Sequence, residues 1–115
     1  MSKGAAESDR GTLLRGALDL LVLRILASGP RHGYAISVRL GQLSDDWLRI
    51  DEGSLYPCLY RMEARGWIQS EVSLSENKRR ARYYSLTSRG ETELREQTDN
   101  WRQFSKVVTT VLREA

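Results

Sequence analysis

The most distinctive chemistry in this sequence is a cluster of basic side chains. Residues 78–82 read KRRAR and carry four cations with no acidic residue between them, namely Lys78, Arg79, Arg80 and Arg82. Over the whole chain, 18 Lys and Arg stand against 15 Asp and Glu, so the net charge is only +3. Cations gathered in this way can neutralise phosphates and release their counterions. The cluster predicts a local contact with a polyanion, although each side chain taken singly is also compatible with a solvated surface charge.

A second group of candidate binding residues lies in residues 53–67, GSLYPCLYRMEARGW. Leu55, Leu59 and Met62 have the i, i+4, i+7 spacing of a helix with one buried stripe. The opposite face and its edges carry groups that can contact phosphates or base edges, namely Ser54, Tyr56, Pro57, Tyr60 and Arg61. This segment therefore predicts a helical binding face close in sequence to the basic cluster.

Pro57 is unexpected inside this helix, because a proline in a helix interior costs about 3 kcal/mol. Asp51 and Ser54 are both candidates for the N-cap. Asp51 is favoured because Asp is a strong cap and the acidic residue after it suits the first turn. Pro57 then falls in the second turn, with its ring on the exposed face, where it can meet a thymine methyl group.

Several other kinds of site are excluded by residue counts. Cys58 is the only cysteine and His32 the only histidine, which leaves no internal disulfide and no Cys/His metal site in one chain. The acidic residues at 45–46 and 51–52 have no histidine beside them and suit helix capping, so we expect neither an enzyme nor a cofactor. Cys58 lies beside the apolar stripe, which favours a buried, inert thiol over a redox sensor.

Membrane insertion and secretion are not expected. The longest apolar run, ALDLLVL at residues 17–23, contains Asp19 and is too short to span a bilayer. The first ten residues, MSKGAAESDR, lack the apolar segment of a signal peptide. We therefore expect a cytoplasmic protein.

The elements that position these groups follow from glycine, proline and hydrophobic spacing. A flexible tail over residues 1–11 is expected before a first helix that begins near Thr12 and ends at SGP, residues 28–30. A second helix begins near Gly33, and the third ends at Gly66. Two β-prone runs, 67–73 and 81–86, flank the polar turn SENKRR, and a last helix follows from residue 87 almost to the C-terminus.

Three helices followed by a two-stranded hairpin predict a winged helix-turn-helix. The fold class is mainly α with a small β-hairpin (α+β), with the DNA-binding domain over 12–86 and a dimerisation helix over 87–115. In such a domain the third helix can lie in the DNA major groove while the basic wing contacts the adjacent backbone.

The terminal helix predicts a homodimer. Its apolar residues recur at alternating spacings of three and four, and no later element of the chain covers them. The first helix is apolar on several sides, so we expect it to pack on the terminal helix of a partner. The alternative is a long helix packed on its own domain. The interface residues expected are Leu14, Leu18, Leu21, Leu94, Trp101, Phe104, Val108, Val111 and Leu112.

Three segments resemble the PadR family of bacterial transcriptional regulators: HGYAISVRL, EGSLYPCLYRMEARGWI and NKRRARYYSLTSRG. The match runs from about Leu13 to Gly90. The single C-terminal helix fits the short form of the family, and SENKRRARYYSLT and DNW resemble its acidobacterial-type branch. The resemblance implies a homodimer that binds pseudo-palindromic operator DNA, usually as a repressor. It also implies that His32, Gly33 and Tyr34 are structural, with Gly33 beginning the second helix and Tyr34 packing.

Carried over by position, the DNA-contact candidates are Ser54, Tyr56, Pro57, Tyr60 and Arg61 of the third helix and Lys78 to Arg82 of the wing. Some members of the family release DNA on binding phenolic or drug-like molecules between the subunits. By that resemblance Trp101 and Phe104 are candidates for an effector pocket, against the favoured interpretation that Trp101 packs in the dimer core. A winged helix used only for contact with other proteins is the rival to DNA binding.

Overall fold

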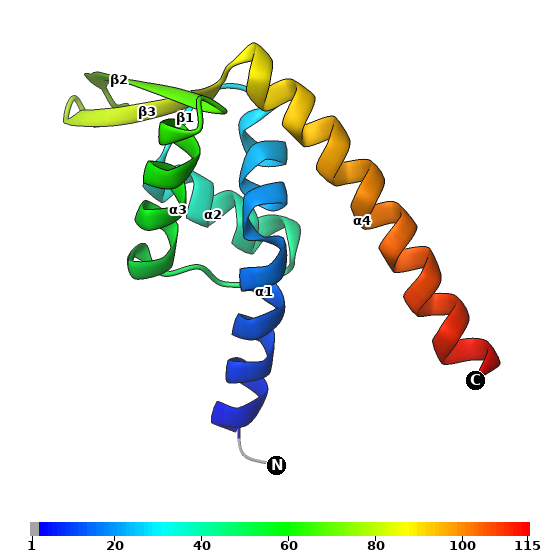
Figure 1. Ribbon diagram of the computed structural model, residues 1–115. Coiled ribbons are helices and arrows are strands. Elements are labelled where there is room, and N and C mark those ends of the chain that lie inside the picture. The colour runs from blue at the N-terminus through cyan, green and yellow to red at the C-terminus, as the bar shows by residue number, and fades with distance from the viewer. Residues whose placement is uncertain (1–2) are drawn as a thin grey trace.

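The computed structural model describes the backbone of residues 3–115 and the side chains from Arg10 onward (Figure 1). In chain order the elements are α1 (Lys3–Leu26), β1 (Arg31–His32), α2 (Gly33–Leu43), α3 (Glu52–Ala64), β2 (Ile68–Leu74), β3 (Arg80–Leu86) and α4 (Ser88–Glu114). The predicted fold class is confirmed: four helices accompany one small antiparallel sheet in the described residues.

The start of α1 differs from the prediction. The helix begins at Lys3, so residues 3–11 are helical and Thr12 lies inside the helix instead of capping it; residues 1–2 lie outside the described part. The segment holds two glycines, each of which costs about 1 kcal/mol in a helix interior, but also several strong helix formers and no proline. A packed helix can therefore extend backward through it without a capping residue.

The core lies where α1, α2 and α3 meet beneath the sheet. The predicted stripe of α3 is confirmed, since Leu55, Leu59 and Met62 are each at most 1% exposed. Leu14 and Leu18 of α1 belong to the same core and are 6% exposed. The chain's own core therefore already covers both side chains, which leaves little of either for the dimer interface predicted for them.

The predicted hairpin is confirmed and gains a third strand. β2 and β3 pair in register from Ile68 opposite Leu86 to Leu74 opposite Arg80. β1 adds two residues on the other edge of β3, which gives the order β1-β3-β2. At the tip, the Lys78 amide donates to the Ser75 carbonyl over 2.8 Å and Lys78 has φ 58°. This is a type I turn followed by a left-handed residue, a common closure for a three-residue hairpin loop.

α4 leaves the domain at an angle (Figure 1). Its predicted N-cap is confirmed, since the Thr87 hydroxyl accepts from the Gly90 amide over 3.1 Å. Only the first half of α4 packs against the domain, and every residue from Asp99 onward is exposed. Within residues 3–115, no helix has both the length and the apolar character needed to cross a membrane.

Candidate nucleic-acid interface

The start of α3 is fixed by Asp51. Its carboxylate accepts from the Ser54 amide over 2.8 Å, which confirms Asp51 as the N-cap. The helix then continues through Pro57 to Ala64. Because the Ser54 amide is used by the cap, only the Ser54 hydroxyl remains to donate to a ligand.

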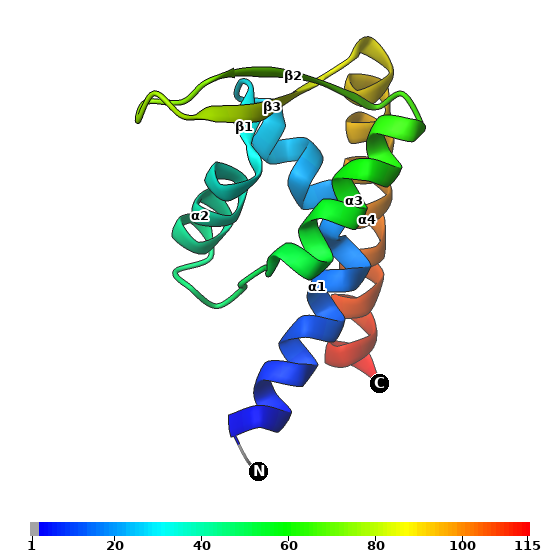
Figure 2. The ribbon, with the colours of Figure 1, turned by 90° about the vertical axis from the view of Figure 1, so that its left-hand side faces the viewer.

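The outward face of α3 carries three of the predicted residues. Tyr60 is 78% exposed, Tyr56 is 43% exposed, and Pro57 is exposed between them. Figure 2 views this side, with α3 in front of α1 and the β2–β3 hairpin extending above α2. Aromatic hydroxyls and an apolar ring are therefore presented together on one surface.

The start of α2 lies against Tyr56 of this surface. Tyr34 is 73% exposed, so the prediction that it packs is wrong. Gly33 lies beneath the Tyr56 ring, because a Cβ atom on Gly33 would stand 2.6 Å from the Tyr56 hydroxyl oxygen. His32 is structural as predicted: its Nδ1 accepts from the Ala35 amide over 3.1 Å, which caps α2, and its ring stacks edge-on against Tyr83.

Arg61 does not extend freely from α3. Its Nη2 lies 2.6 Å from Oδ1 of Asp19 on α1. The Cys58 thiol donates to the same oxygen over 3.3 Å. Cys58 itself is buried, and burial first, then the negative charge of Asp19, raises the pKa of its thiol to about 12. A thiol so rarely ionised is chemically inert near neutral pH, as predicted.

The wing presents the predicted basic cluster. Lys78, Arg79, Arg80 and Arg82 are all exposed, and none forms an ion pair with any described residue. Arg82 differs from the others, because its Nη1 donates to the Ser70 hydroxyl over 3.1 Å. Ser70 in turn donates to the Glu63 carboxylate of α3 over 2.6 Å. These two hydrogen bonds link the wing to α3 through the Ser70 hydroxyl. No sequence pattern predicted this link.

The apolar face of α4 is open to solvent beyond its first turns. Leu94 is partly buried against the chain's own core, and Leu21 of α1 packs there too. Trp101 is 47% exposed, and its ring lies 6.1 Å from that of Phe104. Val108, Val111 and Leu112 are exposed along the same helix. A pocket formed by the two aromatic rings would need a second chain to enclose it.

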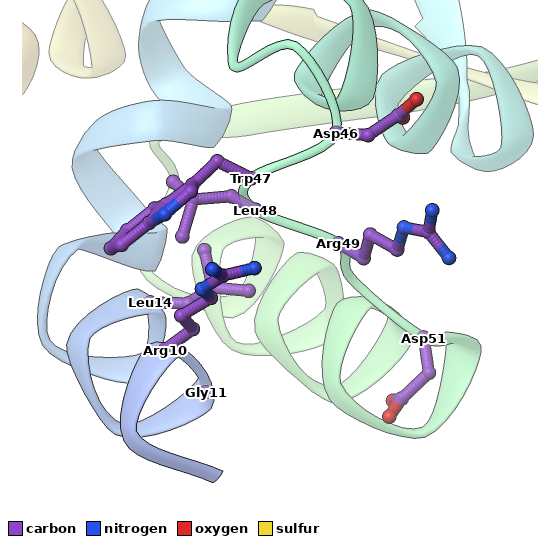
Figure 3. A pocket seen from close by; sticks show the side chains of 8 residues that line it. All are labelled: Arg10, Gly11, Leu14, Asp46, Trp47, Leu48, Arg49 and Asp51. Atoms are coloured by element: carbon purple, nitrogen blue, oxygen red, sulfur yellow. The ribbon is translucent and has the colours of Figure 1, made fainter. Parts of the chain in front are cut away.

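A groove that the sequence did not indicate lies between α1 and the loop from α2 to α3 (Figure 3). It has a volume of about 510 Å³, and the guanidinium of Arg10 stands 4.8 Å from the centre of the Trp47 ring. The lining side chains bring both signs of charge, with Arg49 accompanied by Asp46 and Asp51. Among the side chains described, from Arg10 onward, no three His, Cys, Asp or Glu gather in a geometry that could hold a metal ion. The groove is therefore a mixed surface in which Arg10 secures α1 to the loop.

Comparison with known proteins decides the family. Residues 22–96 match the family model described as the transcriptional regulator PadR-like family. The chain belongs to the PadR family. It is 34% identical over 98 residues to the transcriptional regulator Rv3488 of Mycobacterium tuberculosis, which covers 85% of each chain. Similar solved structures include PadR-family regulators from two other bacteria.

One of these solved structures is the PadR family transcriptional regulator of Eggerthella lenta, with a TM-score of 0.79 and 32% identity over 94% of this chain and 92% of that one. The other is the PadR-like regulator BC4206 of Bacillus cereus, with a TM-score of 0.79 and 28% identity over 90% and 99%. The PadR match spans all of α3 and the wing. This chain is therefore a PadR-type transcriptional regulator, a class that acts in DNA-binding regulation, and not an enzyme.

Proposed function

We propose that this PadR-family protein is a cytoplasmic repressor that binds pseudo-palindromic operator DNA as a homodimer. In the proposed complex α3 lies in the major groove and the wing contacts the adjacent backbone. One observation carries the proposal: α3, which exposes Tyr56, Pro57 and Tyr60, and the β2–β3 wing, which exposes four cations without ion pairs, are both in view from one side of the molecule (Figure 2). A surface used only for protein contact has no need of unpaired cations at a hairpin tip.

The homodimer is supported by the exposed apolar residues of α4. Trp101, Phe104 and Val108 are exposed on a helix whose second half has no buried residue. A stripe of this kind is typical of a helix that packs on another helix. On α1, Leu14 and Leu18 are buried, whereas Leu13 is 62% exposed. We therefore include Leu13 in the proposed interface in place of those two residues.

An aromatic or drug-like effector remains part of the proposal only through the Trp101–Phe104 pair. The two rings are close enough to form one wall of a pocket between subunits. The simpler role for Trp101 is packing in the dimer core, where aromatic residues are enriched. Quenching of Trp101 fluorescence by a candidate aromatic ligand, lost when dilution dissociates the dimer, would favour the pocket.

The salt dependence of DNA binding tests the proposed function. Four phosphate contacts per subunit give eight per dimer, so the affinity should fall by roughly 10⁴-fold between 50 and 200 mM salt. The measurement is fluorescence anisotropy with a duplex from the region upstream of the chain's own gene, located by footprinting. Arg61→Ala should weaken binding to the footprinted duplex more than binding to a scrambled one. Binding that does not change with salt would support the protein-contact alternative.

A further inference from the structure

The contact between Arg61 and Asp19 joins the proposed DNA-reading helix to α1. Within residues 10–115 it is the only ion pair between side chains of two different elements. Arg61 lies on the edge of α3 that faces α1, whereas Pro57 and Tyr60 lie on the outward face. The guanidinium is therefore directed along the flank of the helix and not out from it.

Asp19 is held in place from two sides. Its Oδ1 accepts from Arg61 over 2.6 Å and from the buried Cys58 thiol over 3.3 Å. The Asp19 side chain is 25% exposed and that of Arg61 is 45% exposed. Because the carboxylate is more buried than the guanidinium, Arg61 can leave the pair while Asp19 stays. The pair is therefore a contact that opens by movement of Arg61.

We infer that Asp19 is a specificity-determining residue that withholds the Arg61 charge from DNA lacking a suitable base. The inference rests on the proposed function. A free arginine on this flank would contact phosphate on any sequence and would raise non-specific affinity. While Arg61 is paired with Asp19, its charge is neutralised and adds little to that attraction.

The relative strengths of the contacts explain how the pair discriminates. An exposed or half-exposed ion pair is worth about 1.5- to 5-fold in an equilibrium constant. A bidentate arginine contact with guanine is worth about 5- to 150-fold in discrimination. A contact between Arg61 and a guanine is therefore strong enough to offset the broken ion pair with Asp19, whereas a single contact with a solvated phosphate is not. Arg61 leaves Asp19 only where the sequence offers the stronger acceptor.

Asp19→Asn tests the inference, because asparagine has nearly the same shape and removes only the charge. The measurement is anisotropy with a scrambled duplex and with the footprinted duplex at 50 to 200 mM salt. On the scrambled duplex we expect tighter binding and a salt slope steeper by about 0.9 per subunit. That slope corresponds to an extra loss of about 3.5-fold per subunit over this fourfold range of salt. The ratio of operator affinity to scrambled affinity should fall.

Glu96→Gln is the matched control for net charge, since Glu96 is exposed on α4, away from α3. It should leave the salt slope and the affinity ratio unchanged. Arg61→Gln combined with Asp19→Asn should abolish the increase in affinity for the scrambled duplex that Asp19→Asn gives alone. Arg61→Gln alone should leave the affinity for the scrambled duplex within about twofold of the wild-type value. If thermal unfolding shows that Asp19→Asn does not fold, the Arg61→Gln variant serves as the test instead.

Three outcomes would overturn the inference. If the wild type binds DNA with the expected salt dependence but Asp19→Asn binds the scrambled duplex equally or more weakly, Asp19 does not restrain Arg61 and the proposed function still stands. If Arg61→Gln alone lowers the salt slope on scrambled DNA by about 0.9 per subunit, the arginine is already free. If the wild type itself binds no duplex, both the proposed function and the inference fall.

Discussion

Gly33→Ala should displace Tyr56 from the proposed DNA-binding surface. Gly33 is buried at the start of α2, and a Cβ atom there would lie 2.6 Å from the Tyr56 hydroxyl oxygen, 2.9 Å from Cζ and 3.1 Å from Cε1. These separations are well inside van der Waals contact, so one group must move. Tyr56 is 43% exposed and can rotate toward solvent, whereas the backbone of α2 is held by its cap. The aromatic ring is therefore the group that gives way.

Stability should change little in this variant. Alanine is preferred over glycine within a helix by roughly 0.5–1 kcal/mol, which partly offsets the packing lost when the ring moves. DNA binding should change more, because a displaced hydroxyl loses a hydrogen bond worth about 1 kcal/mol per subunit. For a dimer the loss is about 2 kcal/mol, or about 30-fold in affinity. The melting temperature and the anisotropy titration measure the two effects separately.

Gly16→Ala is the control for this prediction, because a Cβ atom on Gly16 meets no other heavy atom within 4 Å. It should stabilise α1 by roughly 0.5–1 kcal/mol and leave DNA affinity unchanged. In a Tyr56→Ala background, Gly33→Ala should have no further effect on binding. Wild-type affinity in Gly33→Ala, or effects of the two substitutions that add, would refute the proposed coupling of Gly33 to Tyr56.

Three further predictions concern the wing, the dimer and the thiol. Arg79→Ala with Arg80→Ala should weaken binding to every duplex and reduce the salt slope by about 1.8 per subunit, and wild-type binding would remove the wing from the interface. Trp101→Asp or Val108→Asp should give a monomeric mass in light scattering, since a charge would be buried in the proposed interface; an unchanged dimer would place the interface elsewhere. Cys58 should resist iodoacetamide at pH 8 in the native state and react after unfolding, because burial holds its pKa at about 12. The same shift should cost stability as pH rises from about 9 toward 12, since the unfolded thiol ionises first; rapid native alkylation would contradict the buried position.

The parts of the fold that follow local rules were predictable from sequence. The caps at Asp51 and Thr87 and the buried stripe of α3 depend on side chains within a few residues of one another. β1 was not predictable, because two residues carry no period and exist as a strand only through pairing with β3. The burial of Leu14 and Leu18 in the chain's own core was not predictable for a similar reason. A helix that is apolar on several sides does not reveal which side its own domain covers.

The predicted binding residues were found on the surface, but their neighbours could not be predicted. Arg61 and Asp19 are 42 positions apart in the chain, and their contact depends on how α3 crosses α1. Gly33 and Tyr56 meet for the same kind of reason, across the packing of α2 on α3. Tyr34 was expected to pack, yet it is exposed at the first turn of α2. Sequence spacing fixes the face of a single helix, whereas these contacts depend on the geometry between helices.

Pro57 illustrates the different contributions that α3 and the wing make to DNA binding in the proposed complex. The proline removes the amide that would bond to the Gly53 carbonyl, but Gly53 is exposed, so water can satisfy that group. The outward face of α3 then includes Tyr56, Pro57, Tyr60 and Ala64, none of which carries a charge. Such a face contributes shape and apolar contact with bases, while the wing contributes charge. Pro57→Ala should therefore alter sequence preference at an unchanged salt slope, and wing variants should do the reverse.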